Sequence, residues 1–548
     1  MRKVRRLLFF VCIAFLIISG FYIFNGVLQS IFDARNGVHI ITEIDRFGEV
    51  HSIPLRNFNP DNFLKNYREE RNKDYGYNVN KSFNIPWNRT VADQRPQSCK
   101  YALRPTKALP TASIIIVLQN EAPSVVLRMV MSILRQSSPN LVKEILIIDD
   151  GGRETDFYHR SLSTIPKVSV YADHKTIPEG NGPVASLLIG AEKATGEVLV
   201  LMNGAGEVNN GWLEPLLERI QVRKNVVVGP VIDYINSETF KYEFTSTNQR
   251  AVFDWGLSVK WQQLTTETDM IFKKTEPIVT PVFEGNVMAV DRKHFERLGK
   301  FDPGLENWGA ASLELSLKSW MCGGTVEILS CSHVGFIKKH KRSATKKSNS
   351  VSVIRDLRRV AEVWLDGYKR FFYANRPAAR MTSHGSMAER RKMRGQMKCH
   401  SFKWYLDNVL PQLKPLSDDD FVYGRIRQGT DMCMDIALGH VPVLASLSQC
   451  SEEKNSQEWT WKKKGMIKNH GMCLTADLKE THGYVLMQYC NGATSQLWFR
   501  QNDLIVHEVT KQCIDSHKAE MGLVLSECED FIQSQRWTLP KADDVTSQ

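Results

Sequence analysis

Acidic and amide side chains follow two apolar stretches of this 548-residue chain. Asp149 and Asp150 end the run EILIIDD, and Asn203 ends the run VLVLMN. In an open α/β sheet, ligands bind beyond the carboxyl ends of the strands, so Asp150 is a candidate contact for a nucleotide base or ribose. The alternative for the aspartates is turn formation and helix capping, for which this residue type is also favoured.

The stretch Val198–Leu217 predicts a buried strand, a polar turn and the start of a helix, and the rest of the chain is organised around it. Its turn, residues 203–206, reads Asn-Gly-Ala-Gly and brings no carboxylate, imidazole or thiol. A divalent cation needs ligands of those kinds, and the first acid after the turn is Glu207. The stretch therefore indicates a catalytic position without catalytic groups.

Strands and helices alternate around these positions. Continuous aliphatic runs predict buried strands at Ser113–Leu118, Glu144–Ile148 and Val168–Tyr171. A helix is predicted at Ser124–Arg135, after a proline that is tolerated at a helix start, and another ends within Gly190–Thr195. The alternation indicates an α/β, Rossmann-like domain with a mainly parallel sheet.

The amino terminus has the character of a membrane anchor. Leu7–Phe24 is an apolar run of 18 residues, near the lower limit for a spanning helix. Four basic residues precede it, which favours a cytoplasmic amino terminus and a luminal bulk. A cleaved signal peptide is the alternative, although the sequence after Ile18 matches the cleavage pattern poorly. The net charge of +11 is compatible with binding to nucleic acid, with binding to acidic polysaccharide, or with solubility alone. A luminal location argues against binding to nucleic acid.

Cysteine usage agrees with a luminal location. Ten of the 11 cysteines follow the anchor, an even number that suits an oxidising compartment. The polar segment from the anchor to about Gln97 lacks sustained periodicity and is expected to be a stem. Within it, Asn80 and Asn88 each begin an Asn-x-Ser/Thr pattern, which makes them candidate glycosylation sites.

Three self-similar repeats fill the carboxyl-terminal part of the chain, at a spacing of about 40 residues. Each repeat contains a cysteine pair, namely Cys433 with Cys450, Cys473 with Cys490, and Cys513 with Cys528. Each also contains a Gln-x-Trp unit, whose tryptophans are Trp459, Trp498 and Trp537. Three such units predict an all-β β-trefoil of the ricin lectin type, in which each tryptophan fills the shared core.

Several long motifs, in order from about Cys99 to the carboxyl terminus, resemble the polypeptide N-acetylgalactosaminyltransferase family. They are QNEAPSVVLRMVMSIL, EILIIDD, GWLEPLLERI, FDWGLSVKW, LGKFDPGLENWGAASLELSLKSWMCGGTVEILSCSHVG, RRVAEVWLDGYKRFFY and FKWYLDNVLPQL. The resemblance implies a Golgi protein that carries a GT-A catalytic domain and a ricin-type lectin domain. Such proteins transfer GalNAc from UDP-GalNAc to Ser or Thr of a polypeptide, with retention at the anomeric carbon and with bound Mn²⁺.

The resemblance also implies domain limits and disulfides. We expect a cytoplasmic tail at 1–6, a transmembrane signal-anchor at 7–24, a luminal stem at 25–98, a GT-A domain at 99–415 and a β-trefoil at 421–548. The family's pairing implies two bridges in the GT-A domain, Cys99 to Cys331 and Cys322 to Cys399.

The family's metal ligands are absent from the corresponding positions. An Asp-x-His at the strand end falls on Asn203 and Ala205, and a later His in a Val-Gly-His motif falls on Phe336. Asn203 still offers a carbonyl oxygen, whereas Ala205 and Phe336 offer no ligand atom. His333 lies three residues away on the same strand and is expected to point to the other face. The family uses Mn²⁺, but these positions argue against its binding here.

Other residues that line the family's site are also changed. The acid of the family's Trp-Gly-Gly-Glu-Asn segment is replaced by Ala311, and a Gly-Gly pair is replaced by Gly285-Asn286. An Arg-Glu-Gly-Leu segment is replaced by residues 178–181. A Thr and a His of the first strand are replaced by Val117 and Gln119. The retained residues are Asp150, Trp308 and Glu314. The candidate nucleotide-sugar contacts are therefore Asp150, Asn203 and Trp308, on a scaffold that has lost its reactive lining.

Basic side chains offer one substitute for the metal. Lys338 and Lys339 begin the run KKHKRSATKK, residues 338–347, at the place of the family's mobile flap. Metal-independent GT-A enzymes use basic side chains, so these lysines are candidates to replace part of the lost charge. The alternative for this run is a solvated loop.

Sugar binding by the trefoil needs a carboxylate, an aromatic face and an amide. Asp435 and Asp515 supply the carboxylate in two repeats, whereas the middle repeat has Thr475. The asparagine that the family has before each Gln is serine in all three repeats, at positions 456, 495 and 534. Residual GalNAc binding would rest on Asp435 or Asp515, and otherwise the module is structural.

These observations predict a type II Golgi membrane protein with impaired or absent transferase activity. Its expected partners are Ser/Thr-containing glycoproteins or active family members, with a UDP-sugar as a further ligand. Loss of the metal's contribution of several kcal/mol alone predicts a rate lower by about three or more orders of magnitude. The alternatives are a metal-independent O-glycosyltransferase that uses basic residues near Lys338, and a glycoprotein-binding, lectin-like protein.

Overall fold

The computed structural model describes residues 39–44, 50–55, 58–65, 75–100, 108–150, 155–171, 182–245, 248–264, 275–339, 350–414, 421–437, 443–451, 454–457, 459–462, 464–469, 472–478, 483–517 and 522–539. The chain divides into two compact units, each described by itself. The first comprises Met1–Val252, Trp261–Asn349 and Gly395–Cys399, and the second comprises Phe253–Lys260, Ser350–Arg394 and His400–Gln548.

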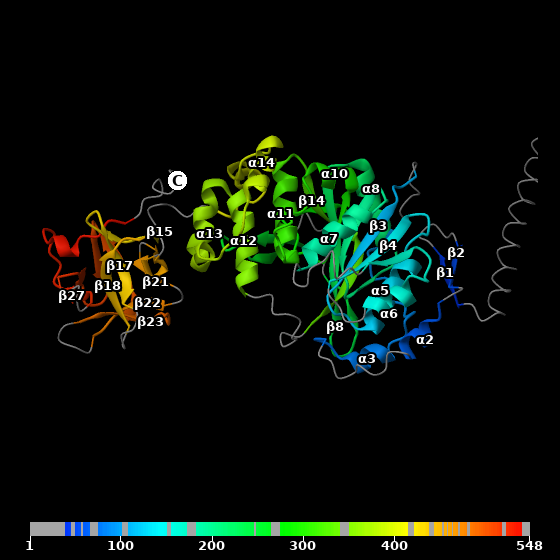
Figure 1. The fold of residues 1–548 in the computed structure, drawn as a ribbon, viewed down its shortest axis with the longest axis horizontal. Coiled ribbons are helices and arrows are strands. Elements are labelled where there is room, and N and C mark those ends of the chain that lie inside the picture. The colour runs from blue at the N-terminus through cyan, green and yellow to red at the C-terminus, as the bar shows by residue number, and fades with distance from the viewer. Residues whose placement is uncertain are drawn as a thin grey trace, which may run out of the picture. The chain divides into compact units, whose positions relative to one another are not determined.

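A ten-stranded sheet is the centre of the first unit (Figure 1). Its main path runs in the order β12 (Pro277–Val279), β14 (Thr325–Lys338), β8 (Val226–Asn236), β13 (Val287–Asp291), β6 (Val198–Asn203), β3 (Ala112–Leu118), β4 (Val142–Asp149) and β5 (Val168–Tyr171). Two short strands complete it: β7 (Gly206–Val208) pairs with β14, and β9 (Tyr242–Glu243) pairs with β8. The polar turn predicted after Val198 thus lies between β6 and β7.

Several antiparallel strands, namely β7, β9, β12 and β13, make the sheet mixed, where the sequence predicted a mainly parallel one. β3 is parallel to β4 and β6, β4 to β5, and β8 to β14, but β13 is antiparallel to both β6 and β8. Val287, at the start of β13, lies opposite Met202 near the end of β6. The chain therefore enters β13 at the carboxyl edge of β6 and runs back along it.

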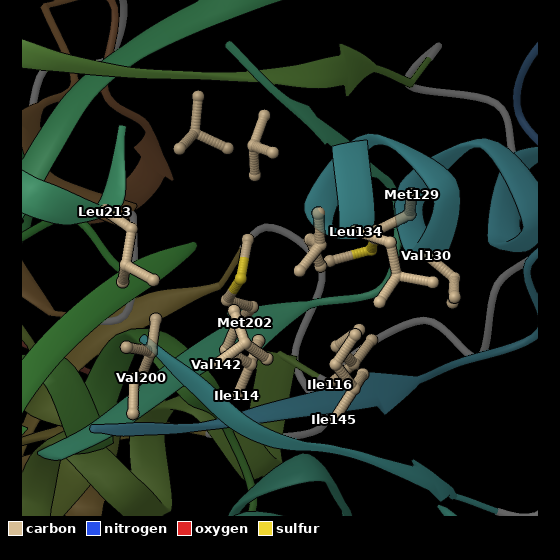
Figure 2. Close-up of a cluster of buried hydrophobic side chains, with 14 of the residues drawn as sticks. Ile114, Ile116, Met129, Val130, Leu134, Val142, Ile145, Val200, Met202 and Leu213 are labelled. Atoms are coloured by element: carbon tan, nitrogen blue, oxygen red, sulfur yellow. The ribbon is translucent and has the colours of Figure 1, made fainter. Parts of the chain in front are cut away.

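Alternation along β3 gives each face of the sheet its own helix. Ile114 and Ile116 lie in one buried cluster with side chains of α5 (Pro123–Arg135), as Figure 2 shows. Ile115 points the other way, because successive strand residues alternate. A Cβ on Gly190 of α7 (Gly182–Lys193) would lie 2.4 Å from its Cγ2, so α7 packs directly on the sheet. Further helices of this unit are α6 (Thr155–Leu162), α8 (Leu213–Val222), α10 (Arg292–Arg297) and α11 (Trp308–Met321).

Residues ahead of the predicted GT-A domain also pack into the first unit. The elements described there are β1 (His39–Ile44), β2 (Val50–Leu55), α2 (Pro60–Lys65), α3 (Val79–Asn84) and α4 (Gln97–Lys100). Leu55, Phe58 and Phe63 are buried in the main hydrophobic cluster. The segment predicted as a stem therefore contributes core residues at these positions.

The predicted anchor at 7–24 lies outside the described residues. Within the described ranges, no helix is both long enough and apolar enough to cross a bilayer. Asn80, on α3, and Asn88 are both exposed, and they stay predicted glycosylation sites.

Five disulfides brace the two units. In the first unit Cys99 bonds to Cys331 and Cys322 to Cys399, at sequence separations of 232 and 77. In the second unit each repeat has its own bridge, Cys433 to Cys450, Cys473 to Cys490, and Cys513 to Cys528. A bridge that closes a long loop restricts the unfolded chain most, so the first bridge constrains the α/β fold strongly.

The second unit contains a helical segment and the repeats. The helical segment comprises α12 (Ser350–Trp364), η2 (Asp366–Tyr368), α13 (Lys369–Asn375), η3 (Pro377–Arg380), α14 (Ala388–Gln396) and α15 (Phe402–Asn408). A separate two-stranded sheet, most of whose residues belong to the first unit, consists of β10 (Gln249–Phe253) and β11 (Val259–Gln263). The repeats are all-β, with strands β15 (Phe421–Gly424), β16 (Arg427–Gln428), β17 (Met432–Ala437), β18 (Leu444–Gln449), β19 (Trp459–Lys462), β20 (Lys464–Gly465), β21 (Ile467–Asn469), β22 (Met472–Ala476), β23 (Val485–Tyr489), β24 (Trp498–Gln501), β25 (Leu504–His507), β26 (Cys513–Asp515) and β27 (Val524–Ser526).

One hydrogen bond recurs in all three repeats. The tryptophan of each Gln-x-Trp unit is fully buried, and its Nε1 donates to the carbonyl of the residue after the first cysteine. The three bonds join Trp459 to Met434 at 2.9 Å, Trp498 to Leu474 at 3.0 Å, and Trp537 to Ile514 at 3.0 Å. The sequence repeat is thus a structural repeat around a common core.

Candidate functional site

Neighbouring strands hold the turn after β6. The backbone N–H of Asn203 donates to the carbonyl of Asn286 at 3.0 Å, just before β13. The N–H of Ile337 in β14 donates to the carbonyl of Ala205, also at 3.0 Å, and Phe336 precedes Ile337. The structure therefore brings together Asn203, Ala205 and Phe336, the three positions that the sequence assigned to the family's metal ligands.

Apolar packing fills two of these three positions. The Phe336 side chain is in the main hydrophobic cluster and lies against Gly206, where a Cβ would be 2.8 Å from its Cε1. Ala205 is 4% exposed and packs in a second cluster with Tyr75 and Tyr77. Mn²⁺ prefers several oxygen or nitrogen ligands, so these residues do not fit the ion.

Glu207, the first acid after the turn, is bound by two arginines. Arg89 contacts both carboxylate oxygens, with an Nε–Oε2 distance of 2.7 Å and an Nη2–Oε1 distance of 2.9 Å, and Arg128 Nε lies 3.0 Å from Oε1. The Arg128 side chain is 2% exposed and that of Glu207 is 6% exposed. Burial lowers the pKa of Arg128, and the adjacent Glu207 opposes that shift. The carboxylate thus anchors the turn to the rest of the unit.

His333 belongs to a separate buried polar group. Its Nδ1 lies 3.0 Å from Asp233 Oδ2, and its Nε2 lies 3.2 Å from the Ser330 carbonyl oxygen. The Tyr242 hydroxyl donates to the same carboxylate. Burial, and to a smaller extent the charge of Asp233, raises the pKa of this tyrosine well above its usual value. In the part of the chain that the structure describes, no three His, Cys, Asp or Glu side chains are grouped to hold a metal.

Unpartnered polar atoms gather beside the start of β13. Gly285, at φ +111°, lies against Trp308: a Cβ there would be 2.9 Å from Trp308 Nε1 and 3.3 Å from Ser312 Oγ. These two atoms and Asn203 Oδ1 are buried and have no hydrogen-bond partner among the described residues. The backbone bond from Asn203 to Asn286 brings the third atom to the same region. The group can donate to or accept from the hydroxyls of a neutral ligand.

The two retained acids have different surroundings. Asp150 follows β4, its backbone N–H donates to the Leu118 carbonyl at 3.0 Å, and its side chain is half-buried. Glu314 is 2% exposed, accepts from the N–H of Asp302 at 2.9 Å and lies 3.4 Å from Lys318 Nζ. Asp150 thus stays a candidate at the carboxyl edge of the sheet, while Glu314 has structural partners. Residues 178–181 lie outside the described residues.

Two lysines at the end of β14 have different partners. Lys339 Nζ lies 3.1 Å from Glu121 Oε1. Glu121 lies beside the turn, because a Cβ on Gly204 would be 3.2 Å from its Oε2. Lys338 Nζ lies 5.3 Å from the centre of the Tyr234 ring. A cation therefore lies near the turn, already paired with a carboxylate; residues 340–347 of the same run lie outside the described residues.

The first candidate lectin residue is hydrogen-bonded within its own repeat. Asp435 accepts from Gln457 Nε2 at 3.0 Å and from the Ser448 hydroxyl, and Lys454 Nζ lies 3.4 Å away. Burial favours the neutral acid, but hydrogen bonds, led by that of Ser448, hold the pKa of Asp435 below its usual value. Asp435, a predicted sugar contact, therefore already has partners within its own repeat.

In the other two repeats, the residue that corresponds to Asp435 also accepts a hydrogen bond from the glutamine of the Gln-x-Trp unit. Gln535 Nε2 donates to Asp515 at 3.0 Å, and Gln496 Nε2 donates to Thr475 Oγ1 at 3.2 Å. Burial is again outweighed by hydrogen bonds, led by that of Gln535, so the pKa of Asp515 lies below its usual value. The second residue after the first cysteine of each repeat thus accepts a hydrogen bond from the repeat's own glutamine, whether it is an aspartate or a threonine.

Acid is expected to weaken the contribution of these two aspartates to stability. Because their folded-state pKa values are lowered, the stabilisation is present above the unfolded value of about 4 and is lost as the pH falls through the folded values. We expect Asp435→Asn/Asp515→Asn to lower the melting temperature at pH 7 and to have a much smaller effect at pH 3. Thermal unfolding of both proteins at several pH values measures this difference. A difference that stays constant with pH would contradict the assignment.

Sequence reasoning missed the partners that hold the turn. Arg89 lies in the segment predicted as a stem, 118 positions from Glu207, and Glu121 was noted only as part of a motif. No local pattern connects residues that far apart. The one available signal was Glu207 itself, an isolated acid after an apolar strand and turn.

Known proteins match over most of the chain. Residues 113–299 match the family model of Glycosyl transferase family 2, and residues 422–537 match that of the Ricin-type beta-trefoil lectin domain. Polypeptide N-acetylgalactosaminyltransferase 14 of Homo sapiens is 34% identical over 484 residues, covering 85% of this chain and 86% of that protein. Polypeptide N-acetylgalactosaminyltransferase 16 of Mus musculus is 35% identical over 484 residues, covering 86% and 85%. The crystal structure of GalNAc-T7 with UDP, GalNAc and Mn²⁺ gives a TM-score of 0.63 at 27% identity, covering 88% of this chain and 90% of that one.

Proposed function

Because the chain belongs to the polypeptide N-acetylgalactosaminyltransferase family, we propose that it is a Golgi type II membrane protein whose GalNAc transfer is impaired or absent. It acts by binding Ser/Thr-containing glycoproteins or active members of the family. Five disulfides support an oxidising, luminal location for its folded part. The predicted anchor at 7–24 supports attachment to the membrane.

One observation carries the proposal: Ala205 and Phe336 are packed in hydrophobic clusters. The related GalNAc-T7 was solved with UDP, GalNAc and Mn²⁺, and a metal ion stabilises the charge that develops on a phosphate leaving group. This chain provides no ligand atoms at two of the three corresponding positions. Its residues do not fit the ion, and we assign no step of a reaction to a metal.

The polar atoms around Gly285 support binding of a UDP-sugar without its turnover. Trp308 Nε1 is a donor, Asn203 Oδ1 is an acceptor, and the Ser312 hydroxyl is both. Leaving such atoms buried without partners costs free energy, so a hydroxyl-bearing ligand that pairs with them is favoured. Asp150, at the end of β4, remains the proposed contact for the nucleotide.

A second candidate function is metal-independent transfer, with Lys339 as the substituting cation. Its position 3.1 Å from Glu121, beside the turn after β6, favours this alternative. The same ion pair opposes it, because the carboxylate already neutralises the ammonium group. A lectin-like function is weakened by the internal hydrogen bonds of Asp435 and Asp515.

Calorimetric titrations of the full chain test the proposed function. We expect UDP-GalNAc to bind with the same affinity in Mn²⁺ and in a chelator, and a Ser/Thr peptide to bind without formation of a glycosylated product. Ser312→Ala is expected to weaken UDP-GalNAc binding by about threefold to tenfold, the effect of one hydrogen bond, and to leave UDP binding unchanged. Ser319→Ala, which removes another buried hydroxyl of α11, is the matched control. Binding of UDP-GalNAc only in the presence of Mn²⁺, or absence of peptide binding, would refute the proposal.

A further inference from the structure

Positive charge is concentrated in the helical segment of the second unit. Ser350–Arg394 contains eleven Lys or Arg residues and four Asp or Glu residues, which gives a net charge of +7. The whole chain has a net charge of +11, so this short segment carries most of the excess. A charge that is this localised is a property of one surface and not of the chain in general.

Three of the four acids of the segment are already paired with cations. Glu362 accepts from Lys369 Nζ and from Arg391 Nη2, both at 2.8 Å, and from the Tyr373 hydroxyl. Burial favours the neutral acid, but the hydrogen bonds of Lys369 and Tyr373 hold the pKa of Glu362 below its usual value. This carboxylate is therefore ionised at neutral pH and shared by two cations. Asp366 pairs with Arg394 at 2.8 Å and Asp356 with Arg355 at 2.8 Å.

Other arginines of the segment bind backbone carbonyls. Arg358 Nη1 donates to the carbonyls of Arg380 and Thr382 at 2.7 and 2.9 Å, and Arg359 Nη1 donates to that of Ser386 at 3.2 Å. A carbonyl oxygen satisfies an N–H group without cancelling the charge of the guanidinium. These hydrogen bonds hold the two guanidinium groups in place, and their positive charge contributes to the field at the surface.

Helix α14 presents the densest part of this charge. It has no buried residue, and Arg390, Arg391, Lys392 and Arg394 fall within five positions. Its contacts with Glu362 and Asp366 hold it to the rest of the segment. A helix without an apolar face has little intrinsic reason to pack, and short Lys/Arg-rich segments are typical of surfaces that bind heparin or nucleic acid.

We propose that Ser350–Arg394 is a binding surface for sulfated glycosaminoglycans, a ligand class separate from the proposed nucleotide-sugar and peptide sites. The five disulfides indicate an oxidising compartment, where the linear polyanions are sulfated polysaccharides and not nucleic acids. The planar fork of arginine suits the oxygen atoms of oxyanions such as sulfate. Such a ligand would meet an array of cations in which three of the four acids of the segment are already paired.

Binding of the full chain to immobilised heparin at about 0.15 M salt, where the Debye length is about 8 Å, tests this surface. Arg390→Gln/Lys392→Gln removes two of the four positive charges that fall within five positions of α14, and we expect about tenfold weaker binding. Lys143→Gln/Lys293→Gln removes two charges from exposed lysines of the first unit and is expected to change binding less than twofold. Both variants have the same net charge, so the comparison separates location from total charge.

A second measurement uses the unmodified protein and does not depend on the folding of a variant. Soluble heparin is expected to displace the chain from the column, while chemically desulfated heparin and anionic phospholipid vesicles are expected not to do so. Equal losses in the two charge variants would show that only total charge matters and would overturn the proposal. Displacement by desulfated heparin, or by vesicles in preference to heparin, would also overturn it, the latter in favour of a membrane surface.

Discussion

The full chain is expected to transfer GalNAc from UDP-GalNAc to a Ser/Thr peptide at least about a thousandfold more slowly than polypeptide N-acetylgalactosaminyltransferase 14 of Homo sapiens. A metal at a diphosphate leaving group contributes several kcal/mol, and about 1.36 kcal/mol corresponds to a tenfold change in rate. Ala205 and Phe336 are buried among apolar side chains, so this contribution is lost. Mass spectrometry of the peptide after incubation with Mn²⁺ measures the rate.

The dependence of any residual transfer on metal provides the control. We expect a trace activity, if one is measured, to be equal in Mn²⁺ and in a chelator. Lys339→Gln would abolish it if the lysine substitutes for the metal, while Lys193→Gln, on α7, would leave it unchanged. A rate within tenfold of the relative's that disappears with chelator would show that our assignment of these positions is wrong.

Glu207→Ala is expected to lower the free energy of unfolding by about 3–5 kcal/mol, the range for removal of one partner from a buried ion pair. The substitution leaves Arg128, whose side chain is 2% exposed, without its carboxylate. Arg89 loses two contacts of 2.7 and 2.9 Å at the same time. Urea unfolding followed by tryptophan fluorescence measures the change.

An exposed acid of the same unit is the matched control for this substitution. Glu243, on β9, is exposed, and Glu243→Ala is expected to change the unfolding free energy by less than about 0.5 kcal/mol. Arg89→Ala/Glu207→Ala should cost less than the sum of its single substitutions, because both side chains belong to one network. Equal effects of Glu207→Ala and Glu243→Ala would rule out a structural role for the network.

The strands around the site followed from residue type alone. The run at 113–118 lies within β3, where every residue is buried, and EILII lies within β4. Continuous β-branched and aliphatic runs are local signals for buried strands. The direction of β13 was not predictable in this way, because it depends on where the chain enters the sheet. Nothing within its sequence, VMAVD, distinguishes a parallel from an antiparallel strand.

The candidate site likewise has one part that the sequence predicts and another part that it does not. Alanine and phenylalanine carry no metal-ligating atom in any fold, so the loss at Ala205 and Phe336 was readable from the sequence. The pairs that hold the remodelled turn join Arg89 to Glu207 and Lys339 to Glu121, across 118 and 218 positions. Contacts at such separations have no period or spacing, and only the folded chain identifies them.

The recurring tryptophan bond of the repeats has an evolutionary consequence. Each indole nitrogen donates to a main-chain carbonyl, so the acceptor of this bond does not depend on the side chain of its residue. Purifying selection for folding therefore does not protect the surface positions that would recognise a carbohydrate. Substitutions at surface positions, such as the serines 456, 495 and 534, can therefore accumulate while the module keeps its fold.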